Sequence, residues 1–571
     1  MQKMKFLKGD KLLFLLVLIL TTIICIPLLS DYLYRGDDLS FHLHRLEAIA
    51  DCLRGGQLLP RVYPYTNFGY GYATPLFYCD LLLYPFAMLL FIDVPTIISY
   101  KIMIAFYTFL NLLFVLLCSK KIFKNNLNVA VILCVVTFIP TRFIDMYFRA
   151  ALGQYIAFCF LPLVVYSIYR LLTKCDKYNF IYVAFSFSFI MLSHNITMLL
   201  ICVCFAIFLL LFFVFSNSKQ KKYIFIQLTL ATFLALLITA FFLLPMFEQY
   251  FAQRLRVHYS TLHMDLQSTA VSLLEMLNPQ FYFSDTSSGP LISKYGLSPL
   301  IILLPFLLLH KKIKMGNINK IIFSLFLLFL ILSTNAIDLS RWIPQLNIIQ
   351  YSFRFFIILS LLFVIAVGII IKHFSNNKLN VIIVLLSVLY ILPAFNILLN
   401  SSKAIPNDII YEEYFNDEHT YKEGYNSYQT LYAEYLPDSV VVDYIDGSRA
   451  IRSVDEWEIY DVTYEYERNF NKIEFEYASE GNEYLMVPLT WYKGYTVKII
   501  DEQGKEYINN TVKDVNYDLV KFKTMRGNNH YIIDYTGTLT QTISLLVSLI
   551  VIIASILTLC RSKRYKSLNN Q

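Results

Sequence analysis

Two adjacent carboxylates follow the first long apolar run of the chain. Asp37 and Asp38 come directly after Gly36, and helical spacing places Asp38, His42 and Arg45 on one face of the helix expected next. In such a pair, one carboxylate can accept the proton of an attacking hydroxyl group while its neighbour holds a divalent cation, Mg²⁺ or Mn²⁺, against a leaving phosphate. This pattern predicts catalytic or metal-binding roles for Asp37 and Asp38, with His42 and Arg45 beside the substrate. The alternative is that one aspartate only caps the N-terminus of an interfacial helix.

Aromatic residues continue the same loop. Tyr70 lies in a Gly-Tyr-Gly-Tyr stretch, and Tyr78 lies near the start of the apolar segment 75–92. Both rings could stack on a sugar, so both tyrosines are candidates for substrate binding. Aromatic side chains at this depth also form the belt found at membrane–water interfaces, and composition alone favours the belt.

Ionisable side chains also lie near the ends of later apolar runs. Charges at membrane depth are costly, so they tend to face a cavity and serve function. Guanidinium groups bind phosphate oxygens bidentately, which makes Arg149 and Arg354 candidates for holding a substrate phosphate, and His194 a further candidate for substrate binding. The alternatives are that Arg142 pairs structurally with Asp145, that Arg354 snorkels to the interface and that His194 is a satisfied residue at a helix end.

The elements that must position these residues are apolar runs of membrane-spanning length. Of the 571 residues, 57% are hydrophobic, and the mean hydropathy is +0.54. Backbone amides in hydrocarbon must be paired within their own segment, so each long run is expected to be a transmembrane helix. About twelve helices are predicted, at 12–30, 96–118, 127–143, 151–172, 178–194, 197–215, 222–244, 297–309, 320–334, 353–371, 379–397 and 540–559.

Basic residues predict the orientation of these helices. With the N-terminus in the cytoplasm, the lysine-rich loops near 120–124, 174–177, 219–222, 311–314 and 372–378 all fall on the cytoplasmic side, as does the basic tail after residue 560. The apolar segment 75–92 would reverse this pattern if it crossed. It is therefore interpreted as a re-entrant or interfacial helix within the first outer loop, and both termini are predicted to be cytoplasmic.

A long segment with a different composition precedes the last apolar run. Between residues 398 and 538 lie 26 of the 41 acidic residues and 19 of the 43 tyrosines. Alternating stretches such as Lys472–Tyr477 and Tyr495–Ile500, with turn signals at Asp446-Gly447 and Gln503-Gly504, favour an antiparallel β-sandwich. The expected fold class is a polytopic α-helical membrane protein with an extracytoplasmic β-sandwich-like domain near the C-terminus.

This reading divides the chain into three parts. Residues 1–397 are the transmembrane domain, with a first outer loop at 31–92 and another at 245–296. Residues 398–538 are the extracytoplasmic domain, and residues 539–571 are the final helix with a basic cytoplasmic tail.

Composition also excludes some functional classes. The basic residues of the membrane part sit in short loops, a pattern of topology control and not of nucleic-acid binding. The ten cysteines include no C-x-x-C pair, and none lies between 398 and 538. A structural zinc site is therefore not expected, and disulfides do not hold the outer domain.

The order of these features resembles the bacterial YfhO-like membrane proteins of the GT-C glycosyltransferase superfamily, related to a membrane group named after pyruvoyl-tetrahydropterin synthase. The matching motifs are Gly36-Asp37-Asp38 with His42 and Arg45, Gly69-Tyr70-Gly71, Pro75 with Phe77-Tyr78, Phe148–Gly153, Ser193-His194-Asn195, Tyr351–Arg354, Glu434–Pro437 and Val487–Tyr495. The chain departs from the pattern at Gln154, where relatives often carry an acidic residue, which puts the partner of Arg149 in doubt. Tyr495 replaces a frequent tryptophan.

The resemblance implies a GT-C-like architecture in a bacterial cell membrane, a polyprenyl-phosphate sugar as donor and an acidic residue of the first outer loop as base or metal ligand. The preferred hypothesis is a glycosyltransferase that moves this sugar to an extracytoplasmic acceptor, such as a teichoic acid or another cell-surface glycan. Two alternatives are a lipid-linked saccharide flippase or transporter, and a non-enzymatic assembly factor of the cell envelope whose outer domain binds glycan.

Overall fold

The computed structural model describes residues 8–568, except for 35, 68, 217, 258–265, 278–296, 311–312, 314–315, 339, 375–376, 405–408, 412–435, 438–450, 455–458, 464 and 482. The expected turn Asp446-Gly447 and much of the outer loop 245–296 lie outside the described residues.

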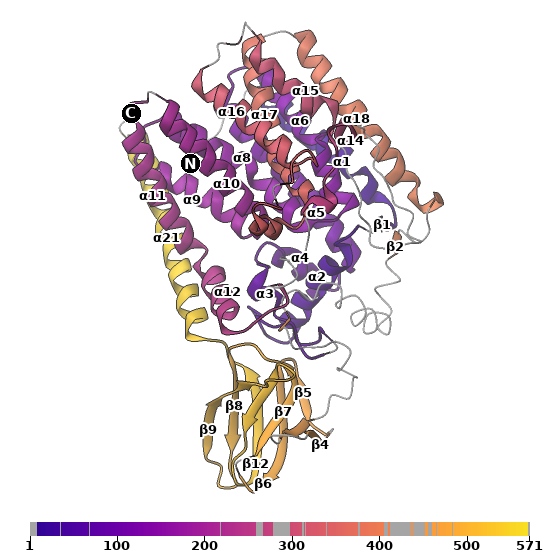
Figure 1. Ribbon diagram of the computed structural model, residues 1–571, viewed down its shortest axis with the longest axis vertical. Helices are drawn as coiled ribbons and strands as arrows, with labels where there is room; N and C mark the ends of the chain where they lie inside the picture. The colour runs from indigo at the N-terminus through magenta and orange to yellow at the C-terminus, as the bar shows by residue number, and fades with distance from the viewer. Residues whose placement is uncertain are drawn as a thin grey trace. The chain divides into compact units, whose positions relative to one another are not determined.

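The chain divides into two compact units, one made mainly of helices and one that contains the two five-stranded sheets (Figure 1). The helical unit comprises Met1–Ser40, Tyr100–Ala235 and Thr261–Glu412. The sheet unit comprises Phe41–Ser99, Leu236–Ser260 and Glu413–Gln571. Part of the first outer loop thus groups with the C-terminal segment, an association that the three-part division of the sequence did not anticipate.

The helical unit consists of long helices joined by short turns. Its elements are α1 (Lys8–Cys25), η1 (Ile26–Leu29), β1 (Tyr32–Tyr34), most of α5 (Thr96–Ile122), α6 (Asn126–Thr137), α7 (Pro140–Phe143), η2 (Ile144–Phe148), α8 (Leu152–Thr173), α9 (Asn179–Met191), α10 (Asn195–Phe215), most of α11 (Lys221–Ile238), η3 (Leu266–Thr269), α14 (Leu273–Leu277), α15 (Pro299–Leu303), η4 (Leu304–Leu309), α16 (Asn317–Leu332), η5 (Pro344–Ile349), η6 (Ser352–Phe355), α17 (Phe356–Phe374), α18 (Asn377–Ala404) and β2 (Ile409–Tyr411).

Seven helices among the described residues are long and apolar enough to cross a membrane, or eight if the bent pair Asn126–Thr137 and Pro140–Phe148 forms one span. Four shorter apolar helices lie at Asn179–Met191, Pro299–Leu309, Asn317–Leu332 and Lys378–Leu392. Together they place an apolar helix in each of the twelve predicted ranges. A multi-pass helical protein with a C-terminal sheet region is therefore confirmed, while twelve crossings stay a prediction.

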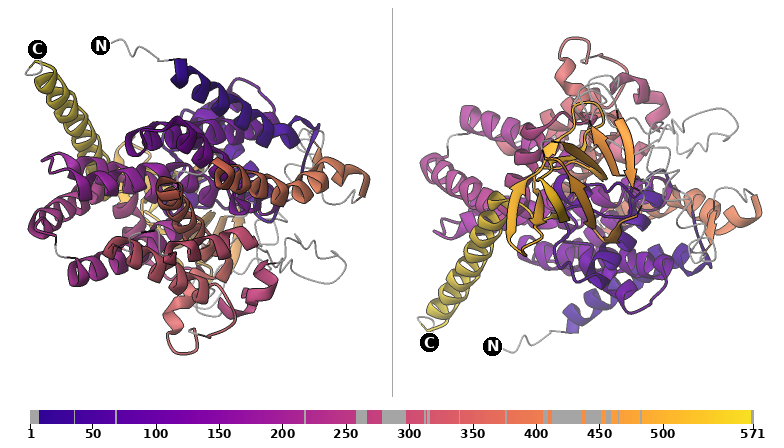
Figure 2. Two further views of the ribbon diagram at one scale, coloured as in Figure 1. Left: turned by 90° about the horizontal axis from the view of Figure 1, so that it is seen from above. Right: turned by 90° about the horizontal axis from the view of Figure 1, so that it is seen from below.

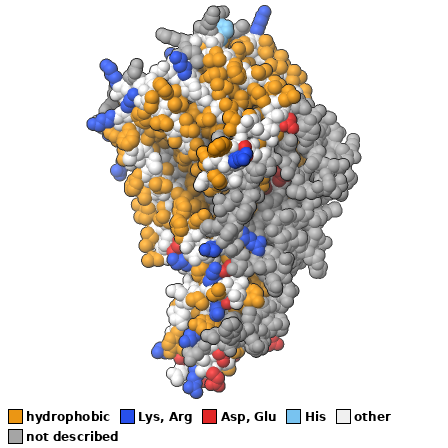
Figure 3. All heavy atoms as spheres, in the orientation of Figure 1, with side chains coloured by type: hydrophobic (Ala, Val, Ile, Leu, Met, Phe, Trp, Pro, Cys, Tyr) orange, Lys and Arg blue, Asp and Glu red, His pale blue; other side chains and the backbone are white. Residues whose placement is uncertain are grey.

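The surface of these helices is suited to lipid. Hydrophobic side chains cover much of the described surface over the helices (Figure 3). Leu12, Leu210 and Phe233, on three different helices, each expose more than half of their side-chain surface. In water such a surface would drive aggregation, but in a bilayer it removes apolar area from water.

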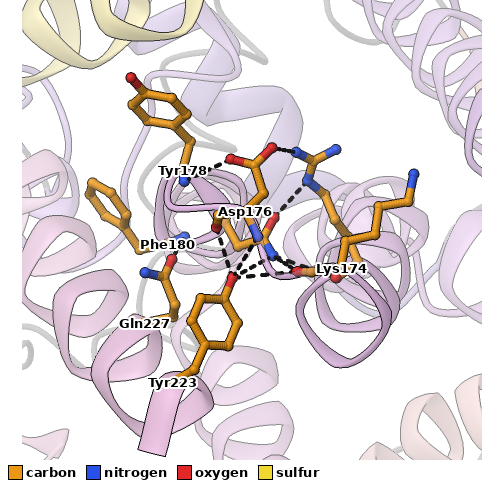
Figure 4. Close-up of polar contacts among 8 residues, drawn as sticks. Lys174, Asp176, Tyr178, Phe180, Tyr223 and Gln227 are labelled. Atoms are coloured by element: carbon orange, nitrogen blue, oxygen red, sulfur yellow. Dashed lines mark hydrogen bonds and ion pairs between the residues drawn. The ribbon is translucent and has the colours of Figure 1, made fainter. Parts of the chain in front are cut away.

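Polar bonds fix the turn between α8 and α9 (Figure 4). Arg170 on α8 donates to Asn179 Oδ1 at 2.7 Å and to Asp176 Oδ2 at 2.6 Å. The Tyr223 hydroxyl of α11 donates to the Asp176 carbonyl at 2.7 Å and accepts from Asn179 Nδ2 at 2.9 Å. Gln227, one turn further along α11, accepts from the Phe180 amide at 2.9 Å. This network joins three helices at one end and satisfies the exposed backbone groups of the turn.

The sheet unit is built around two five-stranded antiparallel sheets, in the order β10-β11-β7-β3-β4 and β5-β6-β12-β8-β9. The strands are β3 (Ile451–Val454), β4 (Ile459–Thr463), β5 (Glu467–Asn469), β6 (Lys472–Ser479), β7 (Tyr484–Thr490), β8 (Tyr495–Ile500), β9 (Glu506–Asn510), β10 (Val512–Lys513), β11 (Leu519–Lys523) and β12 (Gly527–Tyr535). In β12, Tyr531 pairs with Phe475 on one side and with Ile499 on the other. Buried residues from both sheets, including Val487, Phe522 and Tyr531, form one core. The sheets therefore pack face to face, as the alternating pattern predicts.

The loop after the first span packs on these sheets. It contributes most of α2 (Leu39–Arg54), α3 (Thr74–Phe77) and α4 (Tyr84–Phe91). The Tyr70 carbonyl accepts from the Thr490 amide at 2.7 Å, and the Val62 carbonyl accepts from Asn471 Nδ2 at 2.9 Å. Val62 also shares a buried cluster with Tyr492. Both α3 and α4 are far shorter than a membrane span.

Two further helices belong to the sheet unit, α12 (Ala240–Ala252) and α21 (Leu539–Leu568). Glu248 of α12 accepts from the hydroxyl groups of Thr538 and Thr540 at 2.6 and 3.0 Å, and pairs with Lys493 Nζ at 3.2 Å. One carboxylate thus ties the start of α21 to the turn between β7 and β8. From there α21 runs as a single long helix to Leu568 (Figure 2).

Candidate functional site

The paired aspartates lie in a turn that is pressed against the segment around Arg149, within the helical unit. The Asp38 amide donates to the Arg149 carbonyl at 2.8 Å. A Cβ atom added to Gly36 would lie 2.8 Å from Arg149 C, from Ala150 N and from Ala150 Cβ. Glycine is therefore needed at this position because two backbone segments approach each other there. The sequence distance between them is more than 100 residues, so only the tertiary fold brings them together.

Arg149 lies among three carboxylates. Its guanidinium nitrogens are 3.7 Å from Asp37, 3.9 Å from Asp38 and 3.9 Å from Asp145. The side chains of Arg149 and Asp145 are only 5% and 2% exposed, whereas those of Asp37 and Asp38 are 29% and 30% exposed. The buried pair thus forms the floor of the site, and the two aspartates of the turn form the part that a solute could reach.

Two aromatic rings and a second arginine complete the cluster. Arg149 lies over the Phe353 ring at 4.3 Å, and Arg354 lies over the Tyr351 ring at 5.2 Å. The Tyr351 and Phe353 rings are stacked, with centroids 5.0 Å apart. Arg354 Nη1 donates to the Ile349 carbonyl at 3.0 Å, which holds the guanidinium close to its own backbone turn. The η6 segment therefore presents a cationic and aromatic surface beside the carboxylates.

The backbone next to the site is conformationally unusual. Ala150 and Gln350, the residues that adjoin Arg149 and Tyr351, have φ angles of +50° and +67°. Residues other than glycine adopt this left-handed region at a cost of about 1–3 kcal/mol, and such strain clusters at functional sites. Arg149 also follows η2, a π-helical segment, which is another feature enriched at functional sites.

Electrostatics distinguish Asp38 from an ordinary surface carboxylate. Partial burial of the carboxylate raises its pKa above the usual value of 3.8, and the positive charges of Arg149 and Arg354 offset part of that rise. A raised pKa strengthens a carboxylate as a proton acceptor, because a general base works best when its pKa approaches the working pH.

The chain is similar to known proteins over part of its length. Residues 76–401 match the family model of a 6-pyruvoyl-tetrahydropterin synthase related domain, described as a membrane protein. The chain belongs to this membrane family. An uncharacterized protein of Lactococcus lactis subsp. cremoris (strain MG1363) is 24% identical over 176 residues, which cover 30% of this chain and 29% of that relative. The matched region thus spans less than a third of the relative's length.

The family match divides the candidate site. Its range includes Arg149, His194 and Arg354 but begins after Asp37 and Asp38. The carboxylate turn therefore lies outside the match, although the fold places it on the matched Arg149.

Four of the predicted substrate-binding residues belong to the sheet unit: His42, Arg45, Tyr70 and Tyr78. Arg45 is buried and forms an ion pair with Asp80, in which Nε lies 3.0 Å from Oδ1. The Tyr63 hydroxyl donates to the other oxygen of Asp80. The Tyr78 ring lies 4.1 Å from the Arg45 guanidinium, and His42 Nδ1 lies 3.3 Å from Arg45 Nη1. These contacts favour a structural role for Arg45 and Tyr78.

The remaining predicted residues also have well-defined surroundings. Tyr70 is buried in a small cluster with Met486 and Leu519 of the sheets. His194 is the N-cap of α10, and its Nδ1 accepts from the Thr197 amide at 3.2 Å. Capping is the alternative that the sequence offered for this histidine.

Asp145 is the site residue whose role the sequence did not identify. The alternative that Arg142 pairs with Asp145 is wrong, since Arg142 donates to Asn111 and Asp145 lies beside Arg149. Gln154, the departure that put the partner of Arg149 in doubt, lies beside Asp145. The sequence did contain a signal for this pair, because Asp145 lies four positions before Arg149, a spacing that brings two side chains together on a helix.

A metal ion does not fit this arrangement well. Among the described residues there is no group of three or more His, Cys, Asp or Glu side chains that could hold one. The carboxylates of Asp37, Asp38 and Asp145 surround a guanidinium, so Arg149 supplies the positive charge where a cation would bind. No step is therefore assigned to Mg²⁺ or Mn²⁺, and the divalent cation stays a prediction.

Proposed function

We propose that this protein is a membrane glycosyltransferase that moves a sugar from a polyprenyl-phosphate donor to an acceptor outside the cytoplasm, such as a cell-surface glycan. The observation that carries the proposal is the cluster in the helical unit, in which two accessible carboxylates lie beside two arginines and two stacked aromatic rings. Proton transfer, phosphate binding and sugar stacking need these three kinds of group.

Asp38 is the proposed general base. The acceptor hydroxyl gives its proton to the Asp38 carboxylate, and its oxygen attacks the anomeric carbon of the donor sugar. The bond between that carbon and the phosphate oxygen breaks, and its electron pair stays on the phosphate. Attack from the face opposite the leaving group inverts the anomeric centre. Asp37, which lies 3.7 Å from Arg149, orients this arginine.

The arginines are proposed to stabilise the leaving group. Negative charge grows on the phosphate as the glycosidic bond breaks, and a preorganised guanidinium stabilises it more in the transition state than in the ground state. Arg354 donates to the Ile349 carbonyl, and its charge acts on Asp38 as that of Arg149 does. The phosphate is therefore assigned to Arg149 and Arg354 together.

The proposal includes a location. The protein is placed in a bacterial cell membrane as a multi-pass protein, with both termini in the cytoplasm and residues 398–538 outside. The basic loops support this orientation. The cluster would then open on the outer side, where a lipid-linked sugar meets its acceptor.

The test compares single aspartate variants in a deletion strain. Asp38→Asn should lower transfer by about 10²–10⁴-fold, the usual contribution of a general base, and Asp37→Asn should lower it less. Asp31→Asn, in the same loop but on an exposed side chain, is the matched control and should transfer normally. The measurement is the sugar content of surface glycans by mass spectrometry, with protein levels compared by immunoblot.

The outcomes separate the proposed classes of function. Unchanged decoration by Asp38→Asn at normal protein level would refute the catalytic role. A purified wild-type protein that moves lipid-linked sugar across liposomes but forms no transfer product would instead identify a transporter. Rescue of the deletion strain by residues 398–538 alone would identify an assembly factor.

A further inference from the structure

A cavity of about 520 Å³ lies inside the helical unit, away from the carboxylate cluster. Its lining is almost entirely apolar and comes from α5, α6, α8, α9, α10, α16 and α17. Three of these helices line it over long stretches: Asn111 to Ile122 on α5, Phe158 to Thr173 on α8 and Ser360 to His373 on α17. At 1.5 Å per residue, each stretch covers about 16–22 Å of helix.

One end of the cavity is closed by polar groups that are satisfied within the protein. Asn111 donates to the carbonyls of Phe158 and Cys159 at 3.1 Å and accepts from Arg142. Ser360 shares a hydrogen bond of 2.6 Å with Thr141. Because these groups already have partners, this end offers little to a polar ligand.

The opposite end is basic. Lys372 and His373 lie in the last turn of α17, and both line the cavity. The polar network between α8 and α9 begins at Lys174, directly after the lining residue Thr173, and fixes the adjacent turn (Figure 4). Lys372 therefore supplies positive charge at this end of a long apolar chamber.

We propose that this cavity binds one acyl chain of an anionic phospholipid whose phosphate lies against Lys372 and His373. An apolar chamber surrounded by membrane helices excludes a soluble polar ligand, because such a ligand would lose its hydration without gaining hydrogen bonds. The hydrocarbon core of a bilayer is about 30 Å thick, so one leaflet contributes about 15 Å. The lining stretches are longer than this, so the chamber accommodates an acyl chain from one leaflet. The basic mouth selects an anionic headgroup, as basic pockets between membrane helices do.

This site is independent of the proposed transferase site. The orientation proposed above places Lys372 and His373 on the cytoplasmic side and the carboxylate cluster on the outer side. The bound molecule is thus expected to be a phospholipid of the inner leaflet that stabilises the helix bundle, and not the sugar donor. Failure of the transferase proposal would leave this inference standing.

The test counts lipids retained by the full chain. The protein is purified from detergent containing equal amounts of phosphatidylglycerol and phosphatidylcholine, and retained lipids are measured by mass spectrometry. Val115→Phe projects a ring into the cavity and should lower retained phosphatidylglycerol roughly tenfold, because overpacking opposes binding. Leu117→Phe, two residues along the same helix on a side chain that is 46% exposed, should behave like the wild type. Val364→Phe, on α17, repeats the test from another wall.

A second variant tests the headgroup. Lys372→Gln with His373→Gln should retain lipid but lose the preference for phosphatidylglycerol about fivefold, in line with the contribution of one basic residue near an anionic headgroup. Normal retention by both cavity-filling variants would overturn the proposal. So would equal retention of the two phospholipids by the wild type, or retention of a polyprenyl phosphate in their place.

Discussion

Replacement of Gly36 by alanine tests the contact that defines the candidate site. The added Cβ would lie 2.8 Å from two backbone atoms, Arg149 C and Ala150 N, and from Ala150 Cβ. Real Cβ atoms do not approach other atoms this closely, so the aspartate turn must move away from Arg149. Inserting a carbon into a filled site costs about 1–3 kcal/mol, which is the expected loss of unfolding free energy.

The matched control is Gly316→Ala in the same unit. A Cβ at Gly316 would meet no atom within 4 Å, and its backbone has φ −64°. Alanine gains about 0.4–1 kcal/mol through the unfolded chain, but Gly316 is the N-cap of α16, where alanine is less favourable than glycine, so little net change is expected. The two substitutions are chemically identical, so a loss of stability confined to Gly36→Ala isolates the close approach.

Thermal unfolding can be followed through the native cysteines. Ten cysteines are free, and five of them are buried, so a thiol-reactive dye reports their exposure as the protein unfolds in detergent. Gly36→Ala should unfold at a lower temperature than the wild type and should lose transfer activity, while Gly316→Ala should do neither. If both variants unfold at the same temperature, the close approach of the aspartate turn to Arg149 is refuted.

A double substitution sharpens this test. Ala150→Gly removes one of the three clashing atoms and relieves a φ of +50°. Alone it should stabilise by about 1 kcal/mol, since the left-handed conformation costs other residues about that much. Together with Gly36→Ala it should restore part of the lost stability, and strict additivity would count against contact between the two residues.

Three further predictions use the same unfolding assay. Asp38→Asn should raise stability at neutral pH, because burial raises the pKa of Asp38 above 3.8 and the folded carboxylate is therefore less favourable than the unfolded one. This gain should shrink as the pH falls from the raised pKa of folded Asp38 towards 3.8, because the protonated carboxyl is neutral, as asparagine is. A loss of stability at neutral pH would contradict the prediction. Asp80→Asn leaves Arg45 buried without its carboxylate and should cost about 3–5 kcal/mol, whereas Asp51→Asn breaks a more exposed ion pair and should cost under about 1 kcal/mol. Equal effects would refute the buried pair. Tyr223→Phe removes the hydroxyl that joins α11 to the α8–α9 turn and should cost about 1–3 kcal/mol, so no change would contradict its role in the network.

Local patterns account for the parts of the fold that the sequence predicts well. Long apolar runs give helices at the expected positions because hydrocarbon leaves a backbone no other pairing. The alternating stretches Lys472–Tyr477 and Tyr495–Ile500 give β6 and β8, which pair on either side of β12. Both signals depend on neighbours within a few residues, so they need no tertiary structure to be visible.

The contacts that build the sites have no such local signal. Asp80 is the single acidic residue within the apolar segment 75–92, and nothing near it in sequence indicates that it meets Arg45 and Tyr63. Likewise, the Val62 carbonyl meets Asn471 across more than 400 residues. Residue types alone predicted Asp37, Asp38, Arg149 and Arg354 as candidates, but their grouping depends on the tertiary fold.

The segment from Pro140 to Ala150 shows why spacing alone can mislead. Arg142 and Arg149 are seven residues apart, and on a regular α-helix they would share one face, since seven residues make about two turns. The structure gives them different partners: Arg142 meets Asn111 and the Phe158 ring, whereas Arg149 meets three carboxylates. The π-helical η2 lies between them and adds a residue to one turn, which rotates the following side chains by roughly 100°. Arg142 can therefore close the polar end of the cavity while Arg149 forms the floor of the carboxylate site, and a single helical irregularity separates the two roles.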